Sequence, residues 1–174
     1  GYTPNHPVVH RACQFLWQCQ EPDGSWRGRW GVNYIYGTWC VLQGLKAMGI
    51  QNERTARALV WLQSVQNKDG GWGESCLSDQ ENRYVPLGKS TASQTAWAVM
   101  GLLTGGKNDP YAKGVAWLTK AQTSVGDWEE PYFTGTGFPG HFYIRYHGYR
   151  YYFPLLALGR LRETRTVTPF SSGL

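Results

Sequence analysis

The sequence predicts an all-α fold made of helical hairpin repeats, and three observations support this prediction. One motif recurs three times along the 174 residues, each time at the end of an amphipathic helical pattern. A second, more apolar helical pattern follows each copy. Helix pairs that repeat in this way curve into a solenoid or close into an α/α toroid. Three pairs supply about half of an α6/α6 barrel, so we expect an incomplete toroid.

The repeated motif aligns without gaps at residues 11–26, 57–72 and 113–128. Each copy contains an aromatic–aliphatic pair, a glutamine, a glycine and a closing tryptophan. Glutamine falls at the end of each expected helix, where its amide can satisfy free backbone groups of that helix or of a neighbouring one. We therefore assign the glutamines and tryptophans a structural role as clamps between repeats. They are Gln20, Trp26, Gln66, Trp72, Gln122 and Trp128.

The helix that leads into each motif is expected to carry an apolar stripe on one face. In the first and third copies the apolar residues recur at intervals of three and four positions, which is typical of an amphipathic helix. Asp-Gly pairs at 23–24 and 69–70 then supply turn chemistry, with glycine available for positive φ. The stripe residues are Val8, Ala12, Phe15 and Cys19, and then Tyr111, Val115 and Leu118.

More apolar helices are expected at about 34–48, 91–104 and 153–163. The second is apolar on nearly all sides, which predicts burial on most sides. The third would open with Pro154, a residue favoured in the first turn of a helix. Such inner helices leave apolar surface along an open edge, so we expect a partner half to cover it.

The chain starts with Gly1 rather than Met, and we expect it to be a piece of a longer protein. Residues 1–161 are expected to form one segment of the toroid. Residues 162–174 contain Thr, Ser and one Pro without any motif, and are expected to form a polar, frayed tail.

Charged residues make up 17% of the chain, against an ordinary share of about 25%, while there are 22 Gly, 9 Trp and 11 Tyr. This composition excludes a disordered chain, a coiled coil and a collagen-like chain. The net charge is +5, but the basic residues are scattered, so we expect no nucleic-acid partner. Cys13, Cys19, Cys40 and Cys76 lack metal-type spacing and are expected to be small buried side chains in a reducing compartment.

The three repeats resemble the QW motif of the triterpene cyclases, the family of squalene-hopene and oxidosqualene cyclases. The intervening segments are most similar to the squalene-hopene branch, and the resemblance runs from about residue 8 to residue 161. It implies an α/α toroid and a place at the C-terminal end of a longer cyclase. The segments are GSWRGRWGVNYIYGTW (24–39), GGWGES (70–75), SQTAWAVMGL (93–102), WEEPYFTGTGFPGHFY (128–143) and YRYYFPLLALGR (149–160).

The resemblance implies a class II cyclase that converts squalene to hopene or hopanol through a series of ring-closing carbocations. It implies no metal or organic cofactor. Squalene would be bound together with the missing N-terminal part of the enzyme, and a homodimer is one option. The parent enzyme would be intracellular and would sit in one leaflet of a membrane without crossing it. An oxidosqualene-type cyclase remains an alternative.

The acid that starts such a reaction is absent from this chain. The family supplies it as the middle Asp of an Asp-x-Asp-Asp motif, whereas here no two Asp residues are fewer than ten positions apart. We therefore expect no catalytic residue in the chain and no activity from the chain alone. The Asp residues are Asp23, Asp69 and Asp127, which we interpret as turn residues, together with Asp79 and Asp109.

Carbocations need stabilisation that does not trap them, and aromatic faces provide it. By resemblance, the pocket residues are Trp30, Tyr36, Phe138, Phe142, Ile144, Tyr146 and Tyr149. Tyr36 would support the hydrogen-bond network of the acid, and Phe138 and Phe142 would face middle and late cations. Ile144 would form an apolar wall. Core packing remains the alternative for each ring, with the loop around Gly135–Gly140 presenting Phe138.

Several other residues are expected to be structural. Adjacent Glu129 and Glu130 are expected in a solvated turn, and neither His6 with His10 nor His141 with His147 is expected to bind metal. Five tryptophans are assigned to packing: Trp17, Trp39, Trp61, Trp97 and Trp117.

Two further classes of protein remain open. The chain could be a non-catalytic helical repeat module that binds a partner or an apolar ligand. It could also be a protein prenyltransferase subunit, which would need zinc ligands that are not apparent in the sequence.

Overall fold

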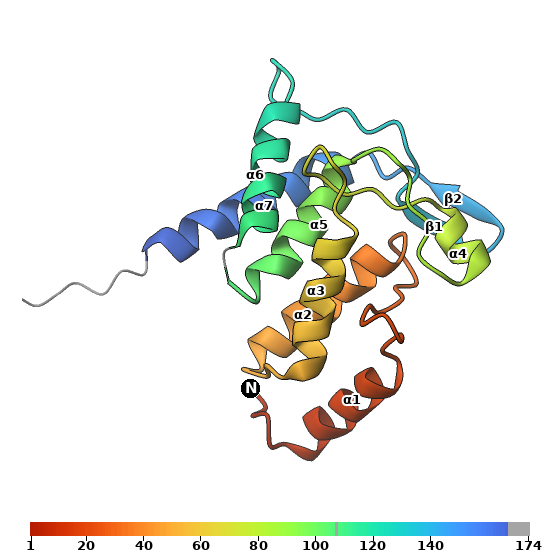
Figure 1. Cartoon of the computed structure of the whole chain (residues 1–174). Helices are drawn as coiled ribbons and strands as arrows, with labels where there is room; N and C mark the ends of the chain where they lie inside the picture. The colour runs from red at the N-terminus through yellow and green to blue at the C-terminus, as the bar shows by residue number, and fades with distance from the viewer. Residues whose placement is uncertain (107, 167–174) are drawn as a thin grey trace, which may run out of the picture.

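The computed structural model describes residues 1–106 and 108–166. These residues form seven α-helices and one small antiparallel sheet (Figure 1). The outer helices are α1 (Pro7–Gln18), α3 (Glu53–Ser64) and α6 (Asp109–Ala121), and the inner helices are α2 (Tyr34–Ala47), α5 (Ala92–Leu103) and α7 (Tyr149–Thr166). The remaining elements are α4 (Leu77–Glu81), β1 (Gly135–Phe138) and β2 (Phe142–Ile144). The predicted outer and inner helices are all present.

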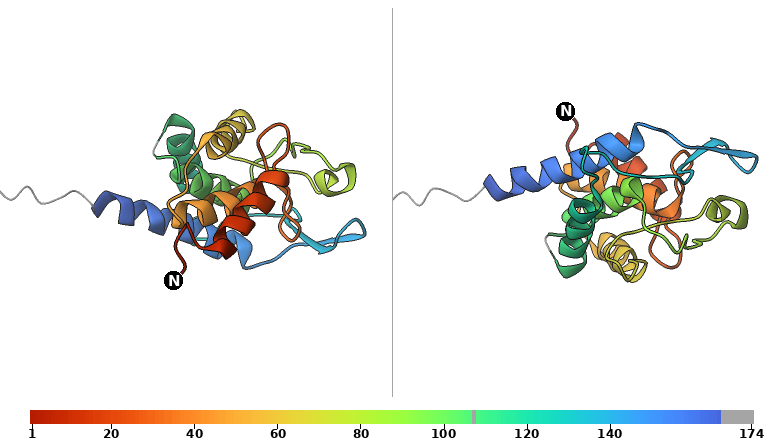
Figure 2. Two further views of the ribbon diagram at one scale, coloured as in Figure 1. Left: turned by 90° about the horizontal axis from the view of Figure 1, so that it is seen from below. Right: turned by 90° about the horizontal axis from the view of Figure 1, so that it is seen from above.

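Helix α5 lies at the centre of the molecule and packs against α7, α2, α6 and α3. Every residue from Ala92 to Leu102 is buried, as the apolar pattern around this helix predicts. The two-stranded hairpin and α4 project together from one end of the helical layer, opposite the last turns of α7 (Figure 2). Helix α1 lies at the edge and has no buried residue.

Short polar side chains cap the starts of α3, α5 and α6. The side chain of Asn52 accepts hydrogen bonds from the N–H groups of Arg54 and Thr55, while Thr55 Oγ1 accepts from the N–H of Asn52, which forms a capping box. The side chains of Thr91 and Asn108 accept in the same way from the N–H groups three residues further on.

The repeats are joined by the glutamine and tryptophan side chains. Gln20 Nε2 donates to the carbonyl of Gly24 and also to that of Arg54, in the outer helix of the next repeat, both at 2.9 Å. Gln66 repeats this pattern with Gly70 and Pro110, both at 2.8 Å. Gln122 Nε2 donates to Gly126. The indole N–H groups of Trp26, Trp72 and Trp128 donate to the carbonyls of Leu16, Leu62 and Leu118 at 2.7–2.8 Å.

The all-α prediction was wrong between residues 135 and 144, where β1 and β2 pair in antiparallel register. Strand β1 is also stabilised by residues 30–32, which lie far from it in the sequence. Val32 N–H donates to the carbonyl of Thr134, and Thr136 N–H donates to that of Trp30. A loop pattern rich in glycine does not reveal the contact between this strand and residues 30–32, because the two segments lie about a hundred residues apart.

Two boundaries also differ from the prediction. Helix α7 begins at Tyr149, so Pro154 lies inside it rather than in its first turn. Tyr149 and Phe153, which precede Pro154, pack on the core, and the helix accordingly starts before the proline. The same helix continues to Thr166, past the expected start of the tail at 162, and residues 167–174 of that tail lie outside the described residues.

The prediction of buried cysteines was wrong. Cys19 and Cys40 are exposed and Cys13 and Cys76 are half-buried, and all four are free thiols. Cys13 and Cys19 lie on or next to α1, which is too peripheral to bury any residue. No described helix is both long and apolar enough to cross a bilayer.

Candidate functional site

Rings from four parts of the chain form one continuous group, which we call the aromatic cluster. Its members are Trp30 in the loop before α2, Tyr36 and Trp39 of α2, Trp97 of α5, and Tyr146, Tyr149, Tyr152 and Phe153 just before and within the first turns of α7. Trp97 is fully buried at its centre, with its ring centroid 5.0 Å from Tyr36, 5.8 Å from Tyr149 and 5.2 Å from Phe153. The cluster joins three inner helices.

Four of the seven predicted pocket residues belong to this cluster. Tyr146 stacks on Tyr149 with centroids 4.6 Å apart, and Trp30 lies 6.1 Å from Tyr146. Tyr36 joins them through Trp97. Trp97 is buried as the packing assignment requires, and it also connects the predicted pocket residues. Phe153, which the sequence did not single out, completes the connection to Trp39 at 5.6 Å.

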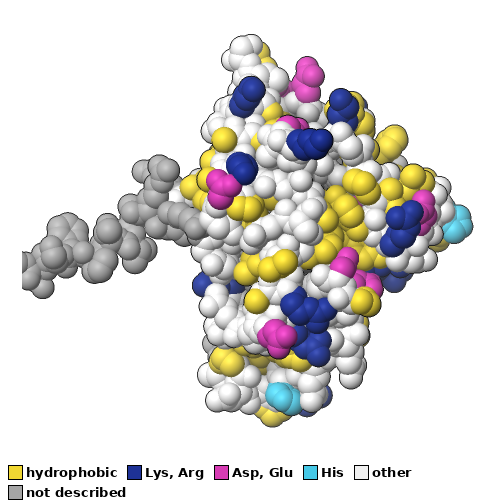
Figure 3. Space-filling view, viewed as in Figure 1, with side chains coloured by type: hydrophobic (Ala, Val, Ile, Leu, Met, Phe, Trp, Pro, Cys, Tyr) yellow, Lys and Arg dark blue, Asp and Glu magenta, His cyan; other side chains and the backbone are white. Residues whose placement is uncertain are grey.

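The other three predicted residues lie on the hairpin. Phe138 ends β1 and Phe142 begins β2, and their rings stack with centroids 6.3 Å apart and an interplanar angle of 18°. Both rings are more than half exposed, as is Trp30. Ile144, at the end of β2, is half-buried. In Figure 3 hydrophobic side chains are exposed in groups on the right-hand half of the view, where the hairpin and α4 lie, while Lys and Arg are scattered.

Glycines provide the space for these rings. A methyl group on Gly31 would collide with the ring of Tyr36, and one on Gly135 would collide with the ring of Tyr146. At Gly137 a methyl group would collide with Phe142 and would lie 2.7 Å from Ile144. The high glycine content near the predicted pocket therefore has a steric cause, since any side chain at these positions would displace a ring.

Two tyrosines of the cluster, Tyr36 and Tyr149, remain uncharged at neutral pH. Burial raises the pKa of Tyr36 to about 12, and the neighbouring Cys40 thiol adds to the increase. Burial also raises the pKa of Tyr149, with smaller contributions from Tyr152 and Tyr36. At neutral pH both phenols are therefore protonated, and they present neutral ring faces.

Two buried glutamates start the inner helices, and the sequence analysis did not identify either of them. Glu74 Oε2 accepts from the backbone N–H groups of Asn33, Tyr34 and Ile35, all at 3.0 Å, at the start of α2. A carboxylate at this end of a helix is favoured because it meets free N–H groups and the positive end of the helix dipole. Burial raises the pKa of Glu74, while these hydrogen bonds act to lower it.

Glu130 has the same role at α5, so its assignment to a solvated turn was wrong, whereas Glu129 is exposed as predicted. Its Oε2 accepts from the N–H of Ser93 at 2.7 Å and its Oε1 from the hydroxyl of Ser93 at 2.9 Å. Glu74 and Glu130 each follow the tryptophan of a repeat by two positions. That fixed offset was the signal that could have identified both residues.

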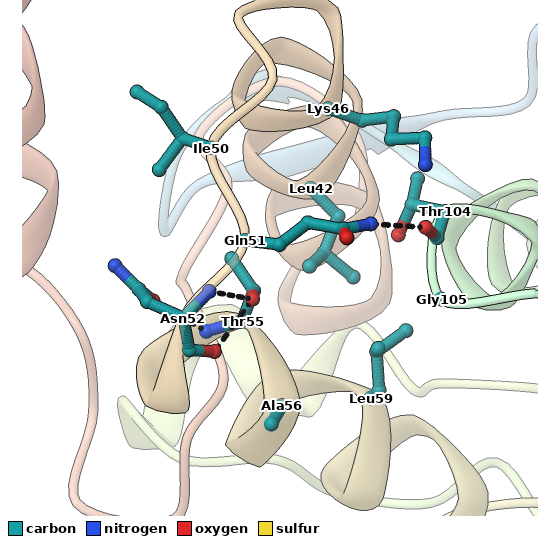
Figure 4. A pocket seen from close by; sticks show the side chains of 10 residues that line it. All are labelled: Leu42, Lys46, Ile50, Gln51, Asn52, Thr55, Ala56, Leu59, Thr104 and Gly105. Atoms are coloured by element: carbon teal, nitrogen blue, oxygen red, sulfur yellow. Dashed lines mark hydrogen bonds between the residues drawn. The ribbon is translucent and has the colours of Figure 1, made fainter.

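A separate cavity of about 220 Å³ lies between the ends of α2, α3 and α5 (Figure 4). Leu42 and Leu59 line its apolar part, and Gln51 Nε2 donates to the carbonyl of Thr104 at 3.0 Å. None of the seven predicted pocket residues lines it. Among the described residues, no group of three or more His, Cys, Asp or Glu side chains could hold a metal ion.

Clamped helical hairpins that stack in this way define a helical-repeat domain. Residues 1–163 match the squalene-hopene cyclase C-terminal domain, and the chain belongs to this family.

Similar proteins include two squalene-hopene cyclases. The one from Alicyclobacillus acidocaldarius is 50% identical over 167 residues, and the one from Zymomonas mobilis is 47% identical over 171 residues. Sporulenol synthase from Bacillus subtilis is 46% identical over 168 residues. These alignments cover 94–95% of the chain and 26% of each relative. The chain therefore spans about a quarter of the length of these relatives.

Proposed function

We propose that this chain is the C-terminal part of a class II triterpene cyclase that converts squalene to hopene or hopanol. In this proposal the aromatic cluster and the hairpin form part of the wall of a cavity in which carbocations are handled. The main support is the exposure of large rings beside a fully packed core, with Trp30 at 51%, Phe138 at 58% and Phe142 at 56%. Contiguous exposed apolar surface of this kind marks a binding or assembly face.

Aromatic rings suit the chemistry of such a cavity. Protonation of a terminal double bond creates a cation that each ring closure moves along the chain. A carboxylate or hydroxyl beside the cation can trap it, whereas a ring face stabilises it by about 2 kcal/mol or more when water is excluded. Excluding water strengthens every such interaction.

The individual residues have distinct proposed roles. Phe138 and Phe142 face cations formed in the middle and late stages, and Ile144 supplies an apolar wall. Tyr36 supports the hydrogen-bond network that reprotonates the acid, which a neutral phenol can do as donor and acceptor. Tyr146 and Tyr149 shape the pocket around the early and middle rings, and Trp30 contributes a further ring to its wall.

Two of the buried carboxylates, Glu74 and Glu130, are committed to helix ends. Both carboxylate oxygens of Glu74 accept N–H groups at the start of α2, and those of Glu130 accept from Ser93 at the start of α5. A carboxylate committed to a helix end has fewer lone pairs available to capture a cation. These two glutamates therefore do not act as free anions in the wall.

The rest of the longer protein supplies what the chain lacks. It provides the Asp-x-Asp-Asp acid, the remaining hairpins that close the toroid and the surface that contacts a membrane. The reaction requires no metal or organic cofactor. The similarity to both squalene-hopene cyclases and a sporulenol synthase fits a shared class II chemistry, and hopene or hopanol is the product that we propose.

The test is to incubate the full-length protein with squalene and identify the products by gas chromatography and mass spectrometry. We expect pentacyclic hopene or hopanol without added metal, and the absence of any cyclised product would contradict the proposal. The 174-residue chain alone serves as a control and should give no product. Turnover by that chain would contradict the assignment of the acid to the missing part.

A further inference from the structure

Asp79 is a buried carboxylate outside the repeats and outside the aromatic cluster. It lies on the short helix α4, and only 2% of its side chain is exposed. Its Oδ1 accepts from Nη2 of Arg27 at 3.0 Å. Its Oδ2 accepts from the backbone N–H of Gly140 at 2.8 Å and from the hydroxyl of Tyr143 at 3.3 Å. Both oxygens therefore bind groups that lie far from α4 in the sequence.

Two of these partners belong to the tip of the hairpin. Gly140 has a φ of +75° and lies in the turn between Phe138 and Phe142. The turn is closed by a hydrogen bond from the N–H of His141 to the carbonyl of Phe138 at 2.9 Å. The N–H that Asp79 binds is thus two residues away from each of the two exposed rings.

The third partner connects the tip to the first repeat. Arg27 Nη2 also donates to the carbonyl of Asp79 at 3.1 Å, and its Nη1 donates to the side chain of Asn82. Arg27 lies three residues before Trp30, whose carbonyl accepts from the N–H of Thr136 at 2.7 Å. The hairpin is therefore fixed at its base by the segment around Trp30 and at its tip by Asp79.

The charge of Asp79 strengthens this attachment. Burial raises the pKa of Asp79, but the hydrogen bond from Gly140 and the guanidinium of Arg27 outweigh that effect, and the pKa lies below its ordinary value. Asp79 is consequently ionised at neutral pH. Hydrogen bonds to an ionised acceptor are roughly twice as strong as those between neutral groups.

We propose that Asp79 is a positioning residue that holds the hairpin turn, and through it the rings of Phe138 and Phe142, at a fixed place in the cavity wall. This inference rests on the proposed function. Because both rings are more than half exposed, little side-chain packing places them, and the backbone of the turn sets their position. If the tip moves, a partly cyclised cation loses ring stabilisation. It then gives up a proton to water, which leaves an alkene with fewer rings.

The experiment compares Asp79→Leu and Asp79→Asn with the wild type in the full-length protein. Leu removes both acceptors, while Asn keeps an acceptor for Gly140 but loses the charge that faces Arg27. Asp109→Asn is the matched control, since Asp109 also pairs with a cation, Lys113 at 2.7 Å, but its side chain is 76% exposed. Products from squalene, the melting temperature and hydrogen exchange at the Gly140 amide are measured for each variant.

We expect the ratio of incompletely cyclised to pentacyclic products to rise about threefold or more in Asp79→Leu. The rise should be smaller in Asp79→Asn, and Asp109→Asn should match the wild type. Exchange at the Gly140 amide should be faster in Asp79→Leu, with the melting temperature of the whole protein little changed. A merely structural role would lower stability without changing the product ratio.

A wild-type product ratio in a folded Asp79→Leu protein would overturn the inference, and so would unchanged exchange at Gly140. If Asp79→Leu does not fold, Asp79→Asn decides by the same two criteria. A wild-type protein that forms no cyclised product would contradict the proposed function instead. In that case the exchange rate at Gly140 still tests whether Asp79 fixes the turn.

Discussion

The core around α5 and the hairpin end of the molecule use aromatic residues in opposite ways. Trp72 is completely buried, and its indole N–H donates to the carbonyl of Leu62 at 2.8 Å. Phe138 and Phe142, by contrast, are more than half exposed. In the core, rings are held by packing, and the three repeat tryptophans are also held by their indole hydrogen bonds. At the hairpin, rings are held by the backbone beneath them and by glycines that leave them space.

Because of this difference, we expect the core rings to determine the stability of the domain and the hairpin rings to determine its function. Loss of a core ring leaves a cavity and an unpaired carbonyl, which costs folding free energy. Loss of a hairpin ring removes little buried surface, so its cost falls on whatever the ring contacts in the complete protein. The repeat motif marks the first group of rings, and exposure marks the second.

The largest expected effect compares one ring from each region. Trp72→Ala should lower the free energy of unfolding by about 3–5 kcal/mol, because it opens a large cavity. Phe138→Ala should change it by less than about 0.5 kcal/mol, as expected for an exposed site. Urea unfolding of the chain followed by far-UV circular dichroism measures both. Equal losses would contradict the division into two regions.

Glu74 provides the next test within the core. Glu74→Gln keeps one oxygen acceptor but turns an amide NH2 toward the N–H groups of Asn33, Tyr34 and Ile35, and should cost about 1–3 kcal/mol, since at least one buried donor loses its acceptor. Glu129→Gln is the control, because Glu129 is exposed and should show no change. The same urea titration measures both variants. A wild-type free energy of unfolding in Glu74→Gln would contradict the role of Glu74 at the start of α2.

The pH dependence of Glu74 has a definite sign. Burial raises its pKa above the ordinary value of 4.5, so the folded chain keeps a proton that the unfolded chain releases. Stability that Glu74 contributes is therefore complete below pH 4.5 and is lost as the pH rises toward its folded pKa. The decline should be shallower in Glu74→Gln, with Glu130 still contributing. A steeper decline in that variant would contradict this sign.

A smaller effect is expected where glycine makes room for a ring. Gly135→Ala forces the ring of Tyr146 to move and should cost about 2 kcal/mol. Gly44→Ala is the control in the last turn of α2, where nothing lies within 4 Å of the added carbon, and it should stabilise the chain by up to about 1 kcal/mol. Thermal unfolding distinguishes the two, and a stabilising Gly135→Ala would show that Tyr146 is not confined.

The smallest expected effect concerns Asp79 and has the opposite pH sign to that of Glu74. Its pKa lies below the ordinary value of 3.8, so its contribution is present above that pH and is lost as the pH falls through the folded pKa. The loss should be less than about 1 kcal/mol, since Arg27 is partly exposed. Acid unfolding of wild type and Asp79→Asn measures it. Identical curves would show that the pair contributes nothing.

The helical layer was predictable because its signals are local. Spacing of apolar residues located the six hairpin helices, and the offsets of glutamine, glycine and tryptophan located the turns. Each indole N–H makes the same contact with the helix that precedes its own turn, ten residues earlier in the chain. Periodicity of this kind survives without any tertiary information.

The candidate site was predictable only in part. Resemblance identified Trp30, Tyr36, Tyr146 and Tyr149, which the structure brings together through Trp97, but the placement of Phe138 depends on a sheet that local patterns do not reveal. Glu130 was assigned to solvent because adjacent acidic residues usually are solvated. Glu130 is buried because it accepts a hydrogen bond from a free N–H group at the start of α5, that of Ser93. Ser93 lies 37 residues earlier in the chain, so local sequence does not reveal the contact.

The most direct test of the aromatic wall compares Phe138→Ala with Phe15→Ala in the full-length protein. Both rings are exposed to a similar extent, but Phe15 lies on α1, away from the hairpin. With squalene as substrate, Phe138→Ala should raise the ratio of incompletely cyclised to pentacyclic products about thirtyfold, as expected when a ring worth about 2 kcal/mol is lost. Phe15→Ala should give wild-type products. A wild-type product profile from a folded Phe138→Ala protein would contradict the account.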